Sequence, residues 1–201
     1  MLGTAIDNPS VFALGLTLAW LAGVRVYLTV FGIGLAGALG WMSLPPDLQV
    51  TSSPWVMVTC ATLALVEFFV DKIPGVDSGW DLLHTLLRVP AGAFLAAAAI
   101  SHDGALGSGA LLAGGALALT SHAIKTGTRA LINTSPEPLS NWGASLSEDT
   151  LSLTALALLL VHPWLALGVS VGALLLVALL VSWVFRAVLI RVSHRRTEAM
   201  A

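Results

Sequence analysis

The chain has 201 residues, of which 57% are hydrophobic and only 10% are charged, and its formal net charge is −2. A soluble domain normally carries about 25% charged residues, so this chain lacks the polar surface of a water-soluble globule of its size. With a mean hydropathy of +0.90, the composition predicts an all-α integral membrane protein. The basic residues are too few, and too rarely interleaved with aromatic residues, for a nucleic-acid-binding protein.

Six apolar segments are candidates for membrane-spanning helices, which need about 20 apolar residues. They are 10–41, 54–71, 80–99, 108–133, 149–162 and 164–190. The first is too long for one perpendicular crossing, so we expect it to tilt or break, and Gly23 beside Arg25 is the natural break point. The fifth is so short that it could be a short span or a re-entrant segment. The whole chain, 1–201, is predicted to form one membrane domain.

The distribution of Lys and Arg predicts the orientation of these segments. No basic residue precedes the first apolar segment, so we expect a retained span rather than a cleaved secretory signal. Four arginines in or near the tail 191–201 predict a cytoplasmic C-terminus, and six spans then predict a cytoplasmic N-terminus (N-in, C-in). The loops that would face outward, 42–53, 100–107 and 162–163, contain no Lys or Arg.

A weak internal similarity suggests a duplication. LAGVRVYLTV (21–30) resembles KTGTRALINT (125–134), each with Gly-x-Arg followed by a leucine and a threonine. With six spans these segments would run in opposite directions across the membrane. This predicts a 3+3 inverted repeat with halves 10–99 and 108–190, in which short, broken or re-entrant helices form the site.

Charge is concentrated in two stretches, EFFVDKIPGVDSGWDLLHTLLRVPAGA (67–93) and HAIKTGTR (122–129). An ionised group in the middle of a bilayer costs roughly 2.5–3.5 kcal/mol, so such groups are usually paired or functional. Helical spacing puts the charges of each stretch on one face. Both stretches would lie in the cytoplasmic half of the bundle, and we expect Asp77, Asp81 and His84 to approach Lys125 and Arg129.

These residues form the predicted substrate- or ion-binding set. It consists of Glu67, Asp71, Asp77, Asp81, His84, Arg88, His122, Lys125, Arg129 and Glu137, with Arg25 as a separate intramembrane charge. No resident cofactor is expected, although a divalent cation could be held by His84, Asp81 and Asp77, because carboxylate and imidazole ligands suit such ions.

Helix capping is the competing explanation for several of the acidic residues. Ser78–Asp81 and Ser145–Glu148 both fit the capping-box pattern, and Ser135-Pro136-Glu137 resembles a helix start with proline in its first turn. Asp71 and Lys72 could equally lie among lipid headgroups. His84 and Arg88 have no capping role, which favours a function for both.

Other motifs carry less information. The GIGLAG stretch (32–37) and the GxxxG pair Gly168 and Gly172 indicate close helix packing, within the protein or in a homo-oligomer. Cys60 is the only cysteine, so no intrachain disulfide can form. No HExxH motif or serine–histidine arrangement supports an enzyme.

Two stretches carry a resemblance to a known family. DKIPGVDSGWDLLHTLLRVPAGA (71–93) and NTSPEPLSN (133–141) resemble the bacterial membrane proteins grouped as domain of unknown function 4126. The similarity runs from about Gly23 to Asp149 and implies a multi-pass protein of the bacterial inner membrane. It implies no activity and no catalytic residues.

Three functions remain open from the sequence, with an enzyme as a weaker fourth class. The first is a small transporter or channel for a cation, either a divalent metal or a proton-coupled ion. The second is the binding or translocation of an anionic substrate such as a lipid phosphate headgroup, with the basic side chains as the clamp. The third is a scaffold in which the charges only hold helices together. Membrane lipids and the transported ion or headgroup are the expected partners.

Overall fold

A computed structural model describes residues 8–100, 106–134 and 138–198. All its regular elements are helices: α1 (Asn8–Ala38), the 3₁₀ helix η1 (Pro46–Ser52), α2 (Pro54–Val70), α3 (Val76–Ile100), α4 (Ser108–Ile132), α5 (Pro138–Val161) and α6 (Pro163–Glu198). The all-α prediction is confirmed. The main difference lies in α5, which begins at Pro138 instead of 149, because its polar first half is helical and turns its polar side chains inward.

Several of these helices suit a membrane. Among the described residues, α1, α3, α5 and α6 are each long and apolar enough to cross one, and η1 and α2, joined at 63°, could form a fifth, bent crossing. Large apolar side chains such as Leu86 (81% exposed) and Leu112 (74% exposed) cover the outside, as expected for a surface that faces lipid. The helices indicate a multi-pass membrane protein. The predicted count of six spans is not confirmed, because α4 does not meet the same criterion.

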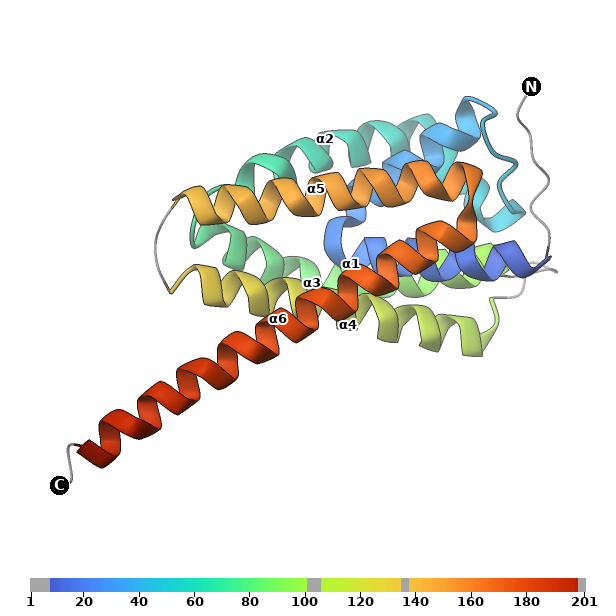
Figure 1. Cartoon of the computed structure of the whole chain (residues 1–201). Coiled ribbons are helices and arrows are strands. Elements are labelled where there is room, and N and C mark those ends of the chain that lie inside the picture. The colour runs from blue at the N-terminus through green and yellow to red at the C-terminus, as the bar shows by residue number, and fades with distance from the viewer. Residues whose placement is uncertain (1–7, 101–105, 135–137, 199–201) are drawn as a thin grey trace.

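Helix α1 is broken at Arg25, which has non-helical backbone angles (φ −142°, ψ 73°). This confirms the break expected beside Gly23. The chain turns back there, so the two halves of α1 form a hairpin with Arg25 at its tip (Figure 1). The first half runs antiparallel to α3, because Gly15 packs against Ala96 while the carbonyl of Gly23 accepts from Arg88. The second half returns toward η1, where Gly34 packs against Thr51.

The hairpin changes the topology expected from the sequence. Helices α2 to α6 run alternately from one end of the bundle to the other, whereas α1 begins and ends at the same end (Figure 1). The first residues of α1 and the last residues of α6 therefore lie at opposite ends of the bundle, and the N-in, C-in arrangement stays a prediction.

The inverted repeat is not confirmed. The Gly-x-Arg segment at 23–25 forms the break in α1, while the one at 127–129 lies in the unbroken helix α4. Up to the break, α1 and α4 also run side by side in the same direction, since Ser121 donates to the Trp20 carbonyl and Lys125 to that of Val24. An inverted repeat would need them to run in opposite directions.

The hairpin is the centre of the bundle and α6 its periphery. In the most apolar window of each helix, 78% of residues are buried for α1 and 11% for α6. Leu14 and Leu18 of α1 pack with Leu95 of α3 and Leu159 of α5 in an apolar core at the end where α1 begins. Beyond the tip of the hairpin the buried side chains are charged or polar. The interior thus has an apolar half and a polar half.

Candidate functional site

The polar half of the interior contains eleven charged side chains that pair with one another. They come from the hairpin tip, α2, the turn after α2, α3, α4 and α5. We call them the charge network, which consists of Arg25, Glu67, Asp71, Lys72, Asp77, Asp81, Arg88, Lys125, Arg129, Glu148 and Asp149.

Arg25 places its guanidinium at the tip of the hairpin, where it is 1% exposed. Its Nη1 pairs with Oδ2 of Asp71, and its Nη2 lies 2.9 Å from Oδ1 of Asp149 and 3.2 Å from Oγ of Ser145. Irregular backbone at membrane depth is tolerated only where protein surrounds it. The ion pairs therefore hold the break of α1 against α5 and the α2–α3 turn.

The break in α1 also frees backbone carbonyls, and basic side chains cover them. Nη1 of Arg88 donates to the Gly23 carbonyl at 3.4 Å, and Nζ of Lys125 donates to the Val24 carbonyl at 3.3 Å. The carbonyl end of a helix carries partial negative charge, so cations are favoured there. The two cations thus stabilise the end of the first half-helix.

Arg88 connects two carboxylates and a histidine. Its Nη2 lies 2.6 Å from Oε1 of Glu67 and 2.8 Å from Oδ1 of Asp81, and its Nη1 lies 3.1 Å from Nδ1 of His122. Because a guanidinium can only donate, Nδ1 of His122 must accept, which leaves Nε2 to donate to Oγ1 of Thr85 at 2.7 Å. The hydrogen bonds therefore favour a neutral imidazole.

Lys125 joins the Arg25 and Arg88 parts of the network. Its Nζ lies 2.9 Å from Oδ2 of Asp71 and 3.1 Å from Oδ1 of Asp81. Burial alone would raise the pKa of Asp71, but the Lys125 ammonium and the Arg25 guanidinium lower it below its ordinary value. Asp71 is therefore held as a carboxylate between two cations.

Arg129 and Lys72 form the part of the network that lies near the α2–α3 turn. Arg129 binds both carboxylate oxygens of Glu148, at 2.9 and 3.2 Å, in a bidentate pair. Its Nη1 also donates to the Asp71 carbonyl at 3.0 Å and to Asn141. Nζ of Lys72 lies 3.6 Å from Oδ2 of Asp149 and 3.1 Å from the ring centroid of Phe68. Burial lowers the pKa of Lys72 below its ordinary value, although Asp149 opposes the change.

Within the described residues, the network has six carboxylates and five basic side chains. If every one of these groups is ionised, one buried negative charge among them remains uncompensated. In the described part of the chain, Oε2 of Glu67 and Oδ2 of Asp81 also have no hydrogen-bond partner, although these residues are 1% and 0% exposed. Both carboxyl groups share the same Arg88 nitrogen, so the surplus charge is best placed beside Arg88.

Nearly all the residues of the predicted binding set lie in or beside this network. Asp81 approaches Lys125 at 3.1 Å and Asp77 approaches Arg129 at 3.9 Å, which confirms the predicted convergence for both acids. The contacts described for His84 are with aromatic residues instead: its ring stacks on Trp80 with centroids 4.0 Å apart and meets Tyr27 edge-on. Glu137 lies outside the described residues.

Two of the capping interpretations are wrong. Asp81 and Glu148 both lie inside helices, and their carboxylates bind Arg88 and Arg129. Asp77 has a local role as well, because its Oδ1 accepts from the Gly75 amide at 2.9 Å in the α2–α3 turn. The possible helix start at 135–137 lies outside the described residues.

The sequence analysis missed Lys72, Glu148 and Asp149 as members of the network. It also missed Asn141 and Ser145, which are 0% exposed and bind Arg129 and Arg25. A signal was available, because polar residues at 141, 145, 148, 149 and 152 recur at helical spacing on one face.

The predicted metal ligands are not assembled. No group of three or more His, Cys, Asp or Glu side chains within the described ranges is arranged to hold a metal ion. Asp77 and Asp81 bind basic partners and His84 contacts aromatic rings, so these three residues do not form a site.

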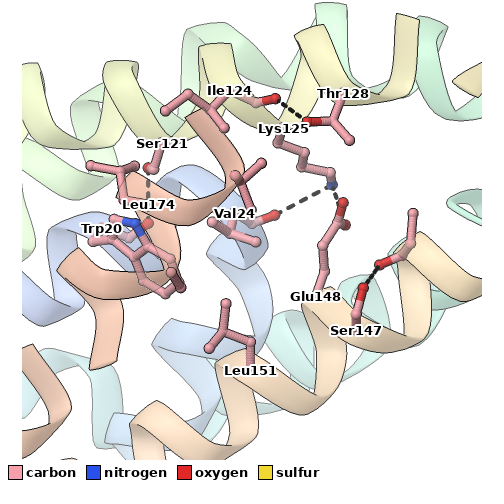
Figure 2. Close-up of a pocket in the computed structure, with 13 residues that line it drawn as sticks. Trp20, Val24, Ser121, Ile124, Lys125, Thr128, Ser147, Glu148, Leu151 and Leu174 are labelled. Atoms are coloured by element: carbon pink, nitrogen blue, oxygen red, sulfur yellow. Dashed lines mark hydrogen bonds and ion pairs between the residues drawn. The ribbon is translucent and has the colours of Figure 1, made fainter. Parts of the chain in front are cut away.

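Three grooves lead from the outside of the bundle to the network. The groove between α4, α5 and α6 has a volume of about 110 Å³ and ends at Lys125 and Glu148 (Figure 2). The groove between α3 and α4, about 400 Å³, reaches Asp81 and His122. The groove formed by the second half of α1, α2 and α5 has about 400 Å³ and reaches Arg25, Glu67 and Asp149.

Comparisons with known proteins identify the family. No curated protein and no solved structure shows significant similarity to the chain. A family model described as a domain of unknown function (DUF4126) matches residues 12–184, which include all eleven members of the charge network. This match agrees with the resemblance of the two charged stretches, and the chain belongs to the DUF4126 family.

Proposed function

We propose that this protein is a small transporter or channel that moves a proton or another small monovalent cation through the charge network. The observation that supports it most directly is the surplus of one carboxylate among the buried pairs, located at Glu67 and Asp81 beside Arg88. Leaving one carboxylate charge uncompensated in a membrane interior is costly. A bound proton or monovalent cation removes this cost, and its exchange with the two sides of the membrane constitutes transport.

The broken helix α1 supports the same proposal. Many membrane transporters bind their ions where a discontinuous helix ends inside the membrane, because the free carbonyl and amide groups of the half-helices provide partial charges. Here the break at Arg25 lies against the network, and the Gly23 and Val24 carbonyls already accept from basic side chains. We propose five crossing helices, α2 to α6, around a re-entrant hairpin, in a bacterial inner membrane with the C-terminal end of α6 in the cytoplasm.

A divalent metal is a weaker candidate, since no ligand group for it is assembled in the described part of the chain. An anionic substrate would have to displace carboxylates from the guanidinium groups, because Arg25, Arg88 and Arg129 are already paired. The scaffold alternative has one observation in its favour, which is that each cation of the network has a carboxylate partner. An experiment must therefore distinguish a transporter from a scaffold in which the ion pairs only hold helices together.

The test is ion flux in proteoliposomes with a pH-sensitive dye inside and a defined membrane potential. Wild-type protein should conduct protons, or Na⁺ or K⁺ in matched gradients, above empty liposomes. Glu67→Gln removes the surplus charge and should abolish this flux without loss of thermal stability. Asp47→Asn, in η1 and outside the network, should conduct like wild type. Wild-type flux equal to that of empty liposomes, or unchanged by Glu67→Gln, would refute the proposal and favour the scaffold.

A further inference from the structure

The groove between α2 and α5 has a form suited to an amphipathic ligand. The second half of α1 forms its floor, and its walls are apolar, with Leu28, Phe31, Ala64, Leu65 and Leu153 among them. Leu65 and Leu153 are 62% and 55% exposed, so the groove opens on the outer surface of the bundle. Its volume of about 400 Å³ falls within the range of small-molecule sites, about 300–1,000 Å³.

The polar end of this groove favours a positive charge. It is lined by one guanidinium, from Arg25, and two carboxylates, from Glu67 and Asp149. Arg25 is already paired with Asp149 and with Asp71. Oε1 of Glu67 pairs with Arg88, while Oε2 is buried without a hydrogen-bond partner in a residue that lines the groove. A buried carboxylate oxygen without a partner is costly and is satisfied by a cation or a hydrogen-bond donor.

The aromatic lining favours the same charge. Phe31 and Phe68 line the groove, and aromatic faces attract cations, most strongly where water is excluded. The Lys72 ammonium lies 3.1 Å from the Phe68 ring centroid, so this ring already makes one cation–π contact. An anionic headgroup would find two carboxylates there and no unpaired basic side chain among the lining residues.

We infer that the groove lined by Phe31, Ala64, Glu67 and Leu153 binds a lipophilic cation, an apolar or aromatic molecule carrying one positive charge. The apolar body lies between α2 and α5, and its charge approaches Oε2 of Glu67. The transport step of this inference rests on the proposed function. When the lipophilic cation binds, the proton or small cation that neutralises Glu67 leaves. One positive charge is therefore exchanged for another at Glu67.

Binding can be tested without any ion gradient, which keeps this inference separate from the proposed function. Tetraphenylphosphonium and tetraphenylborate have nearly the same shape and opposite charge. Each is measured by equilibrium dialysis against purified full-length protein in detergent, with protein-free micelles as the blank. Tetraphenylphosphonium should bind at one site per chain and at least about tenfold more tightly than tetraphenylborate, the ratio expected from one buried charge contact.

Two variants locate the site. Ala64→Trp fills the groove and should abolish tetraphenylphosphonium binding, whereas Ala123→Trp, in the separate groove between α3 and α4, should leave it unchanged. Glu67→Gln should reduce the preference for the cation over the anion to near unity. Circular dichroism and melting temperature establish that each variant is folded, and the wild-type comparison of the two ions stands even if a variant does not fold.

Three results would overturn the inference. They are equal or tighter binding of tetraphenylborate, binding of the cation that Ala64→Trp leaves unchanged, and no binding of either ion above the micelle blank. Any of these could occur while proton flux is normal, in which case the groove is occupied by lipid chains only. Conversely, if the lipophilic cation binds in this groove but the protein conducts no protons, the binding site stands and the proposed transport is refuted.

Discussion

Arg88 and Glu67 form one ion pair of the network, yet we expect their substitution by glutamine to lower the melting temperature by different amounts. Arg88→Gln leaves Glu67 and Asp81 buried without their shared cation, and breaking a buried ion pair in this way costs about 3–5 kcal/mol. Glu67→Gln instead removes the surplus negative charge and leaves five carboxylates for five cations. We therefore expect a large fall in melting temperature for Arg88→Gln and a small change for Glu67→Gln.

The measurement is thermal unfolding of both variants in the same detergent. Arg186→Gln is the matched control, because Arg186 is exposed on α6 and surface substitutions usually change stability by less than about 0.5 kcal/mol. If Glu67→Gln is as destabilising as Arg88→Gln, the network does not carry a surplus negative charge, and the argument for a bound proton or cation fails.

At the scale of single residues, the sequence predicted most of the network because ionised groups are rare and costly in so apolar a chain. It failed where another explanation was available for the same residue. Glu148 fits a capping box only if a helix begins near Ser145, and that depends on Pro138 and on packing against Arg129. His84 shares a stripe with Arg88, but its ring stacks on Trp80 and has no ion pair in the described part of the network. Side-chain direction of this kind is set by neighbours that sequence spacing does not reveal.

At the scale of elements, the break in α1 was predictable and its consequence was not. A glycine and an arginine inside an apolar segment indicate a weak point, and Arg25 is where the backbone leaves the helix. Whether the second half continues or turns back depends on partners from distant segments. Asp71 and Asp149 bind Arg25 at the tip, while Leu156 and Thr51 pack along the returning half. None of these contacts is local in the sequence.

Gly23 should be essential for the hairpin to approach α4. A Cβ at Gly23 would collide with Oγ of Ser121 and with the backbone carbonyl of Ala118, and the backbone cannot move aside without disturbing α4. Gly23→Ala should therefore lower the melting temperature markedly and weaken the contacts of Lys125 and Arg88 with the hairpin carbonyls.

Gly127 provides the matched control on α4. A Cβ at Gly127 meets nothing within 4 Å, and Ala is favoured over Gly inside a helix by about 1 kcal/mol. Gly127→Ala should thus be neutral or stabilising in the same melting experiment. Similar losses of stability in the two variants would mean that α1 does not pack against α4 through Gly23.

At the scale of the whole molecule, hydropathy predicted where the helices lie, and charge asymmetry predicted which loops lie together. The 71–75 turn and the start of α5 do lie at one end, where Arg129 contacts both Asp71 and Asn141. The six-span topology assumed that every long apolar segment crosses once. One re-entrant element is enough to reverse the position of everything before it, and apolar length cannot distinguish a crossing from a hairpin.

The arrangement of α1 makes a prediction about the side on which each end of the chain lies. Because α1 turns back at Arg25, its first residues should lie on the same side as η1, and the α2–α3 turn and the end of α6 on the other. By the positive-inside rule, the arginines of the tail predict that this second side is cytoplasmic. Single cysteines at Gln49, Ile73 and Thr134, and at an added N-terminal tag, can be introduced in a Cys60→Ala background. An impermeant maleimide applied to intact cells should label the tag and position 49 but not positions 73 and 134. Labelling of position 49 without labelling of the tag would mean that α1 crosses the membrane once, and Arg25 would then be a kink in a spanning helix instead of the tip of a hairpin.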